Sequence, residues 1–490
     1  MSERGAIARN AAHLVLGQAG TTLLAVLLSA ALGRSLGAAE FGLYFVLTSM
    51  TAFALVVVEW GQNQYVVREV ARRPQAAGAL LTGAVTNRAT GAVAAAGVTA
   101  VAAAGLGYDR RTCALVALLV VALTPSFLAQ AWGATFRGRE RMDCDALVSV
   151  ANKLLGLVLS VGALVLGGGL AGVILAQGVA GLGALALAVV LGRRLGIEVA
   201  RPSLAIAREL LVGGTPIVAM SLAIAAQGYV DAVLLSKLAP AHVVGWYGAA
   251  RSILGTLVAP AALLGTAAFP AMSRAASDPA RLGAELRAAM RPLLLLAAVA
   301  GVGTYLFADL GVAVVYGAER FGPAGAVLRA SAPGLFLLFV DVLLGSAIVA
   351  AGRATALAAA KVLNVLAIGG LELLLVPFFQ ARSGNGAIGV VVAFAASEIL
   401  MFLAAVLVIP RAALSRAFFA DLGRAVLLAG GTLVAAASVP AGSEAVAVAV
   451  AVLAFVALTV ALRLVGRADL EALALAFRRR ATAARVPPRG

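Results

Sequence analysis

The sequence predicts an all-α membrane protein that crosses the bilayer about fourteen times, and two observations support this prediction. First, 62% of the 490 residues are hydrophobic and only 12% are charged, which is too little polar surface to cover a water-soluble globule. Second, apolar runs of about 20 residues, the length that spans a hydrocarbon core, follow one another along almost the whole chain. These runs leave no room for a separate soluble domain.

The apolar runs give the bounds of the predicted helices. In the first half of the chain these helices are placed at residues 11–33, 42–66, 78–105, 113–136, 146–167 and 170–192. In the second half they are placed at 209–235, 243–270, 290–314, 324–351, 355–379, 386–409, 418–438 and 444–465. The first run follows Arg4 and Arg9, as in a signal peptide, but so many runs follow that we interpret it as an uncleaved membrane helix.

The basic residues predict the orientation in the membrane. The formal charge is +16, and the short gaps between apolar runs hold most of the basic residues. When successive gaps are assigned to alternate sides, 27 basic residues fall on the side of the termini and 7 on the other. Because cytoplasmic segments are enriched in Lys and Arg, we expect both termini in the cytoplasm. The scattered distribution also argues against a nucleic-acid partner.

The sequence offers no candidate for catalysis, a metal or a bound cofactor. Cys113 and Cys144 are predicted on opposite sides of the membrane and cannot pair, and His13 and His242 have no partners spaced for a metal. No phosphate-binding loop of the nucleotide-hydrolysing type occurs, and the longest inner gap, 273–291, holds no catalytic constellation. We therefore expect a protein that is not an enzyme.

A weak internal repeat divides the chain. Residues 33–44 and 236–247, at an offset of 203, share a basic residue and a glycine followed two residues later by tyrosine. Two of the three lysines, Lys153 and Lys361, then recur early in the fifth and eleventh predicted helices. The repeat predicts two six-helix lobes of the same orientation, 1–200 and 201–412, around a central cavity, which is typical of alternating access. Residues 413–466 add two helices, and 467–490 form a basic cytoplasmic tail.

Several short motifs, in their order and spacing, resemble those of a known family. They are LGRSLG at 32–37, EFGLY at 40–44, GQN at 61–63, VRE at 67–69, VDAVLL at 230–235, VGWYGAAR at 244–251 and FP at 269–270. Together they resemble the polysaccharide-export, or oligosaccharide flippase, branch of the multidrug/oligosaccharidyl-lipid/polysaccharide (MOP) superfamily. The likeness extends from the first predicted helix to about the twelfth.

The resemblance implies a function at the bacterial cytoplasmic membrane. It implies a multi-pass flippase that moves an undecaprenyl-diphosphate-linked oligosaccharide from the inner to the outer leaflet for surface polysaccharide assembly. Its partners would be membrane lipid, the lipid-linked substrate, and glycosyltransferases or a polymerase of the same pathway. A multidrug exporter or a peptidoglycan lipid-precursor flippase of the same superfamily remains open. A membrane glycan polymerase or glycosyltransferase is less favoured, because the outer gaps are too short to hold donor and acceptor.

Ionisable residues inside the predicted spans are the candidate site residues, because a charge at membrane depth is costly unless it serves a purpose. Four are basic and suit a diphosphate head group, which binds guanidinium and ammonium groups; they are Arg88, Arg251, Lys153 and Lys361. Arg88 lies deepest, about 15 Å into its helix. Five are acidic and are interpreted either as sites for a driving H⁺ or Na⁺ or as buried partners of the cations; they are Glu59, Asp231, Asp341, Glu372 and Glu398.

Overall fold

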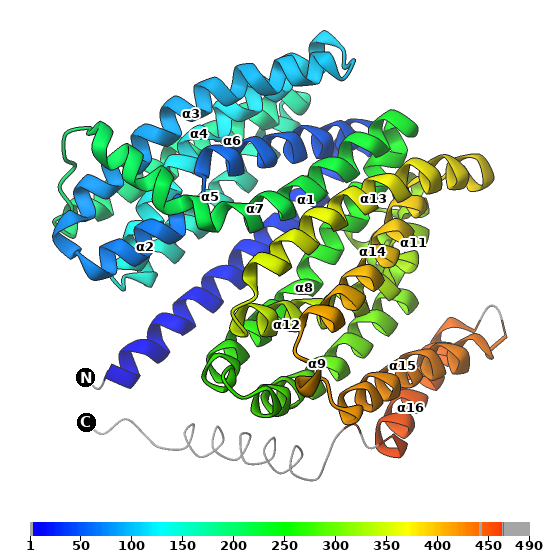
Figure 1. Cartoon of the computed structure of the whole chain (residues 1–490). Helices are drawn as coiled ribbons and strands as arrows, with labels where there is room; N and C mark the ends of the chain where they lie inside the picture. The colour runs from blue at the N-terminus through cyan, green and yellow to red at the C-terminus, as the bar shows by residue number, and fades with distance from the viewer. Residues whose placement is uncertain (1–2, 441–442, 463, 465–490) are drawn as a thin grey trace, which may run out of the picture. The chain divides into compact units, whose positions relative to one another are not determined.

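The computed structural model describes residues 3–440, 443–462 and 464, and all regular elements in this part of the chain are helical (Figure 1). In the first half they are α1 (Glu3–Glu59), α2 (Gln62–Arg72), α3 (Ala77–Gly105), α4 (Arg110–Gly138), α5 (Met142–Val165), α6 (Gly169–Arg194), α7 (Leu204–Leu238) and α8 (Ala241–Ala275). In the second half they are α9 (Pro279–Leu306), α10 (Ala308–Tyr316), α11 (Ala318–Ala330), α12 (Ala332–Ala350), α13 (Ala354–Ser383), α14 (Ala387–Val408), α15 (Arg416–Ala437) and α16 (Glu444–Ala461). Short 3₁₀ turns cover Pro74–Ala76 and Arg411–Ala413.

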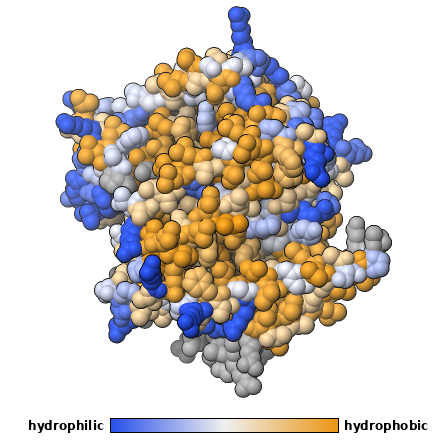
Figure 2. All heavy atoms as spheres, turned by 45° about the vertical axis from the view of Figure 1, so that its right-hand side comes forward, coloured by the Kyte–Doolittle hydropathy of each residue, from blue (hydrophilic) through white to orange (hydrophobic). Residues whose placement is uncertain are grey.

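The predicted all-helical, multi-pass membrane fold is confirmed. Within the described residues, eleven helices are long and apolar enough to cross a membrane. Hydrophobic side chains cover much of the surface seen in Figure 2, and leucines such as Leu407 are largely exposed, as lipid contact allows. Most helix bounds agree with the predicted spans to within a few residues. The total of fourteen spans stays a prediction.

Four predicted spans differ from the helices. The first two form the single helix α1, bent at Gly37, whose φ of 77° suits glycine because a Cβ would be strained there. The second span is also interrupted before α2 by Trp60 and Gly61, both with positive φ. The span predicted at 290–314 is divided at Phe307 into α9 and α10. The span predicted at 324–351 is divided at Ser331, just before Pro333 in the first turn of α12, because proline cannot donate to the preceding helix.

The chain forms two compact units. The first comprises the described residues of Met1–Thr256, Asp309–Val327 and Lys361–Ala393. The second comprises those of Leu257–Ala308, Leu328–Ala360 and Phe394–Gly490. The lobes predicted from the repeat, 1–200 and 201–412, have other bounds, and that division stays a prediction. The predicted basic tail, 467–490, lies outside the described residues.

In the first unit, α1 packs against α5 and α7, and α4, α5 and α6 pack closely on one another. Small residues permit this packing. A Cβ on Gly181 of α6 would lie 2.5 Å from the Ser126 hydroxyl of α4, and one on Gly17 of α1 would lie 2.9 Å from Ala146 of α5. Glycine at such contacts lets helix backbones approach closely, as is common in membrane proteins. The polar cavity described below lies among these helices.

In the second unit, α9 packs against α12 and α15, and α15 packs against α16. A buried aspartate of α15, Asp421, joins α15 to α9. Its carboxylate accepts from Arg287 at 2.6 Å and from Arg424 at 3.2 Å, and Arg291 lies 3.9 Å away. One carboxylate thus fixes three guanidinium groups at this end of the helices.

Candidate functional site

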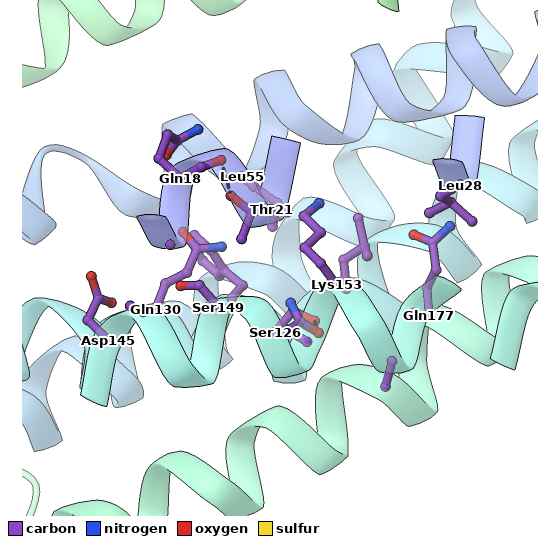
Figure 3. A pocket seen from close by; sticks show the side chains of 17 residues that line it. Gln18, Thr21, Leu28, Leu55, Ser126, Gln130, Asp145, Ser149, Lys153 and Gln177 are labelled. Atoms are coloured by element: carbon purple, nitrogen blue, oxygen red, sulfur yellow. Dashed lines mark hydrogen bonds between the residues drawn. The ribbon is translucent and has the colours of Figure 1, made fainter. Parts of the chain in front are cut away.

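A polar cavity of about 410 Å³ lies among α1, α4, α5 and α6 in the first unit (Figure 3). Its polar lining comes from all four helices: Gln18, Thr21, Ser126, Gln130, Asp145, Ser149, Asn152, Lys153 and Gln177. Leu28, Leu55, Leu123 and Phe127 supply apolar wall. A cavity with many hydrogen-bonding side chains at membrane depth suits a hydrated, polar solute such as a sugar.

Lys153 of α5 is the cation that lines this cavity. In Figure 3 its side chain extends from α5 toward α1, into the space beside Thr21. Lys153 and Thr21 also line an adjoining cavity of about 250 Å³ that reaches Ser252 and Thr256 of α8. Lys153 therefore lines both spaces, and its predicted binding of a diphosphate stays a prediction.

The acidic residue of the cavity, Asp145, is paired. Its carboxylate accepts from Arg137 of α4 at 2.8 Å. The two residues, with Asn63, line a third cavity of about 250 Å³ that shares Ser126 and other residues with the first. Because the Arg137–Asp145 pair is neutral, Lys153 leaves an excess of positive charge over the three adjoining cavities.

The α5 face of the cavity has a simple origin in the sequence. Its residues include Asp145, Ser149, Asn152, Lys153 and Gly156. Apart from the adjacent Asn152 and Lys153, neighbours in this set are three or four residues apart, and this spacing places side chains on one face of an α-helix. Lys153 is the one residue of this face that the sequence predicts as a site residue, because Asp145 lies just before the span predicted at 146–167 and the other side chains are uncharged. The position of the small polar residues Ser149 and Asn152 on the same helix face as Lys153 is the sequence signal that identifies this wall of the cavity.

Arg88, the deepest predicted cation, is not among the residues that line this cavity. Its side chain is 0% exposed. It donates to the Phe127 carbonyl at 2.9 Å and to the Asn63 side chain at 2.8 Å, and it lies 3.8 Å from Glu59. Its guanidinium also stacks on the Phe127 ring, 4.7 Å from the centroid.

Glu59 and Arg88 therefore belong to one buried network. The Glu59 carboxylate also accepts from the backbone N–H groups of Gly61 and Asn63, at 3.0 and 2.5 Å, and so holds the break between α1 and α2. The network joins α1, α2, α3 and α4. This geometry gives Arg88 and Glu59 a packing role, and substrate binding by Arg88 stays a prediction.

Arg251 lies with two predicted acidic residues from distant parts of the chain. The Tyr247 hydroxyl donates to Asp231 at 2.7 Å, and the Asp231 carboxyl neighbours both Glu372 and Arg251. Glu372 is 0% exposed, and within the described residues neither of its carboxyl oxygens has a hydrogen-bond partner. Two adjacent buried carboxyls repel when both are ionised, so a proton or a cation between them lowers the energy.

Three of the predicted site residues remain. Lys361 is on α13 in the first unit, whereas Asp341 of α12 and Glu398 of α14 are buried in the second unit. None of the three lines the cavity around Lys153. Their predicted roles in substrate binding or ion coupling stay predictions.

The two basic residues of the repeat, Arg34 and Lys237, make analogous contacts. Arg34 of α1 donates to the carbonyls of Val314 and Val315 at the end of α10. Lys237 of α7 lies 3.5 Å from the centroid of the Tyr108 ring, between α3 and α4. Burial raises the pKa of the Tyr108 hydroxyl, so this ring is neutral and its face attracts the ammonium. Arg34, just before the bend of α1, thus binds the end of α10, and Lys237, near the end of α7, binds the connection between α3 and α4.

The described part of the chain is an all-helical, multi-pass membrane fold with polar cavities between its helices. The family described as "Polysaccharide biosynthesis protein" matches residues 7–276, more than half of the chain, so the chain belongs to this family. No curated protein matches the sequence.

Solved structures share the fold at low sequence identity. Lipid II flippase MurJ, in an inward closed conformation, has a TM-score of 0.71 at 12% identity, over 92% of this chain and 98% of that one. An inward-facing multidrug resistance MATE family transporter of the MOP superfamily has a TM-score of 0.62 at 14% identity, over 81% and 96%. A MOP superfamily transporter from Pyrococcus furiosus has a TM-score of 0.55 at 15% identity, over 84% and 96%. The resemblance to the MOP superfamily is thus confirmed for the fold.

Proposed function

We propose that the chain is a flippase that moves an undecaprenyl-diphosphate-linked oligosaccharide from the inner to the outer leaflet of the bacterial cytoplasmic membrane. Membership of a polysaccharide biosynthesis family and similarity to the fold of a lipid II flippase support this proposal. The observation that carries it is the position of Lys153 in a cavity whose other polar side chains are amides, hydroxyls and Asp145, which is paired with Arg137. Glycosyltransferases or a polymerase would supply and consume the substrate.

The proposed division of labour within the cavity follows from its chemistry. Lys153 would bind the diphosphate as a compact point charge. The glutamines, asparagine, serines and threonine around it offer donors and acceptors to sugar hydroxyls in a lining that does not demand one particular sugar. Because the Arg137–Asp145 pair is already neutral, the diphosphate would be attracted to Lys153.

The driving force in this proposal acts at the buried pair Asp231 and Glu372. Uptake of H⁺ or Na⁺ between the two carboxyls relieves their repulsion, and a conformation that shields them from water would favour the occupied form. A ligand that binds one conformation more tightly shifts the population toward it. Such a site couples an ion gradient to alternating access. Asp341 and Glu398 are secondary candidates for this coupling.

In the proposed orientation both termini are cytoplasmic, and the contacts of Arg34, just before the bend of α1, and of Lys237, near the end of α7, lie on the outer side. These contacts would hold the outer side closed while the cavity loads from the cytoplasm. Their release would be the step that exposes the cavity to the outside.

The test is translocation by the purified full chain in proteoliposomes, with a fluorescent undecaprenyl-diphosphate glycan and imposed H⁺ or Na⁺ gradients. Lys153→Gln should slow translocation about tenfold, since a hydrogen bond to a charged group contributes roughly 1.5–3 kcal/mol. Lys153→Arg, which keeps the charge, is the matched control and should retain most of the rate. Equal rates for Lys153→Gln and the unmodified chain would contradict the assignment of the cavity.

Two other activities are compatible with the fold, and the same experiment tests both of them. If the chain moves a peptidoglycan lipid precursor but no peptide-free undecaprenyl-diphosphate-linked oligosaccharide, it is a precursor flippase. If it moves neither lipid but exports organic cations along a gradient, the multidrug exporter is correct. Because Asp145 is paired with Arg137, the excess positive charge of Lys153 favours an anionic substrate over a cationic drug.

A further inference from the structure

The third cavity, of about 250 Å³, contains one hydrogen-bond donor whose direction is fixed. The cavity lies in the first unit among α2, α4 and α5. Its lining includes four amide and hydroxyl side chains, Asn63, Gln130, Ser149 and Asn152, and two apolar ones, Ala129 and Val148. Several of its residues also line the cavity around Lys153, so one ligand can occupy both spaces.

The direction of the Asn63 amide follows from its contact with Arg88. The Asn63 Oδ1 atom accepts from Arg88 at 2.8 Å. Because a guanidinium group only donates, the amide cannot turn over, and its Nδ2 group is left to face the cavity. Arg88 also donates to the Phe127 carbonyl at 2.9 Å, and the Asn63 backbone N–H donates to Glu59 at 2.5 Å. The two Nδ2 donors are therefore positioned before any ligand binds.

The other amide and hydroxyl groups of this cavity can adjust to a ligand. Asn152 accepts from the Ser126 hydroxyl at 3.1 Å, but a hydroxyl can also accept, so this amide can turn over and keep its partner. Gln130 and Ser149 likewise offer either a donor or an acceptor. Asn63 alone among these groups makes a fixed demand, because its Nδ2 group requires an acceptor on the ligand.

An acetamido group has the chemistry that this lining requires. Its carbonyl oxygen accepts from the Asn63 Nδ2 group, and its N–H donates to Gln130 or Ser149. Its methyl group packs on Ala129 and Val148, the apolar part of the lining. A hydroxyl group also accepts from Asn63, but it leaves this apolar surface in contact with water, which is unfavourable.

A carboxylate group suits the same cavity less well. The Asp145 carboxylate lines the cavity and is paired with Arg137 at 2.8 Å. A second carboxylate beside this neutral pair is repelled by Asp145, and it has neither a methyl group nor an N–H. The lining therefore favours a neutral acceptor over an anionic one.

We propose that the third cavity binds an acetamido group of the substrate, and that Asn63 selects lipid-linked glycans in which the sugar next to the diphosphate carries this group. Ser149 and Lys153 lie one turn apart on α5, about 6 Å along the helix axis, so a sugar linked to a diphosphate at Lys153 reaches the third cavity. This inference rests on the proposed function. It names one substituent of the substrate and leaves the rest of the sugar open.

Equilibrium binding to the purified full chain in detergent tests this proposal without requiring transport. The probes are water-soluble short-chain prenyl diphosphates linked to N-acetylglucosamine, glucose or glucuronic acid, and titration calorimetry gives the Kd of each. The N-acetylglucosamine probe should bind about tenfold more tightly than the glucose probe, a factor typical of one added hydrogen bond. Equal Kd values for these two probes, tighter binding of the glucuronic acid probe, or no binding of any probe would overturn the proposal.

Asn63→Asp tests the fixed donor, because it keeps an oxygen for Arg88 and removes both donors from the cavity. It should abolish the preference for the N-acetylglucosamine probe. Gln18→Glu is the matched control, since it adds the same charge to the cavity around Lys153 but does not line the third cavity; it should weaken both probes equally and keep their ratio. A preference that survives Asn63→Asp, or is lost in Gln18→Glu, would overturn the proposal.

Val148→Thr tests the methyl contact separately from the charge. Threonine has the shape of valine but places a hydroxyl against the methyl group, which is unfavourable. The variant should weaken the N-acetylglucosamine probe several-fold and leave the glucose probe unchanged, whereas equal changes for both probes would overturn the proposal. A chain that shows the binding preference but translocates no lipid-linked glycan would contradict the proposed function and still support this site.

Discussion

Gly42 of α1 and Gly245 of α8 occupy equivalent positions of the 203-residue repeat and pack directly against each other. A Cβ on Gly42 would overlap the Ala241 carbonyl and lie 2.7 Å from the Gly245 amide nitrogen. A Cβ on Gly245 would overlap the Ala38 carbonyl. The same segments carry Arg34 and Lys237, so the two halves of the repeat meet where the proposed outer closure lies.

The first prediction concerns this glycine contact. Gly245→Ala should force the two helices apart, because backbone cannot yield as a flexible side chain can, and should lower stability by roughly 1–3 kcal/mol. Gly255→Ala, in the same helix, is the control, since its Cβ meets no atom within 4 Å among the described residues. Thermal unfolding in detergent measures both. A lower midpoint for Gly255→Ala than for Gly245→Ala would contradict the close contact.

The second prediction concerns the closure at Arg34. Arg34→Gln removes the charge that binds the two carbonyls at the end of α10 and should shift the population toward the outward-open form. A single cysteine at Ser252 of the cavity should then react several times faster with a membrane-impermeant maleimide added outside. Arg110→Gln, at an exposed arginine on the same predicted side, should leave the labelling rate unchanged. An unchanged rate in Arg34→Gln would remove Arg34 from the closure.

The third prediction separates packing from substrate binding at Arg88. Arg88→Ala leaves the Asn63 side chain, the Phe127 carbonyl and the Glu59 carboxylate without their buried donor. Breaking a buried charged pair costs about 3 kcal/mol or more, so the thermal midpoint should fall clearly. Lys153→Ala, at an accessible cavity residue, should leave the midpoint nearly unchanged and slow translocation. The reverse pattern would restore Arg88 as the substrate cation.

The fourth prediction concerns the ion-coupling pair. Glu372→Gln keeps the shape of the side chain but removes its charge, so translocation should lose its response to an imposed H⁺ or Na⁺ gradient. Glu285→Gln, at an exposed acid of α9, is the control and should respond as the unmodified chain does. The ratio of rates with and without the gradient is the measurement. A Glu372→Gln chain that still responds fully would exclude this pair as the coupling site.

The fifth prediction concerns the attachment of α15. Asp421→Asn removes the carboxylate that holds Arg287 and Arg424, and the three arginines then repel one another. Loss of charge-assisted hydrogen bonds of this kind costs roughly 1.5–3 kcal/mol, which should lower the thermal midpoint. Asp278→Asn, in an exposed pair with Arg281, should change it little. Equal effects of the two substitutions would show that the cluster does not stabilise the helix.

Local properties of the sequence predicted the helices well. Hydropathy and the length of each apolar run are local, and the bilayer demands a helix wherever such a run crosses it, so most bounds agree to within a few residues. The exceptions are at backbone features that hydropathy does not register. Examples are the left-handed residues Trp60 and Gly61 and the break at Ser331.

The sequence by itself determined the fold class, the family resemblance and the set of ionisable residues at membrane depth. Only the tertiary structure decided that Lys153 lines the cavity whereas Arg88 is sealed among four helices, and that Asp231 meets Glu372 across a long stretch of chain. In a chain this apolar, a helix is hydrophobic on nearly every side, so periodicity does not distinguish a face toward lipid from one toward protein. That distinction is made by which helices pack together, because neighbouring helices determine whether a charge meets water, a partner or hydrocarbon.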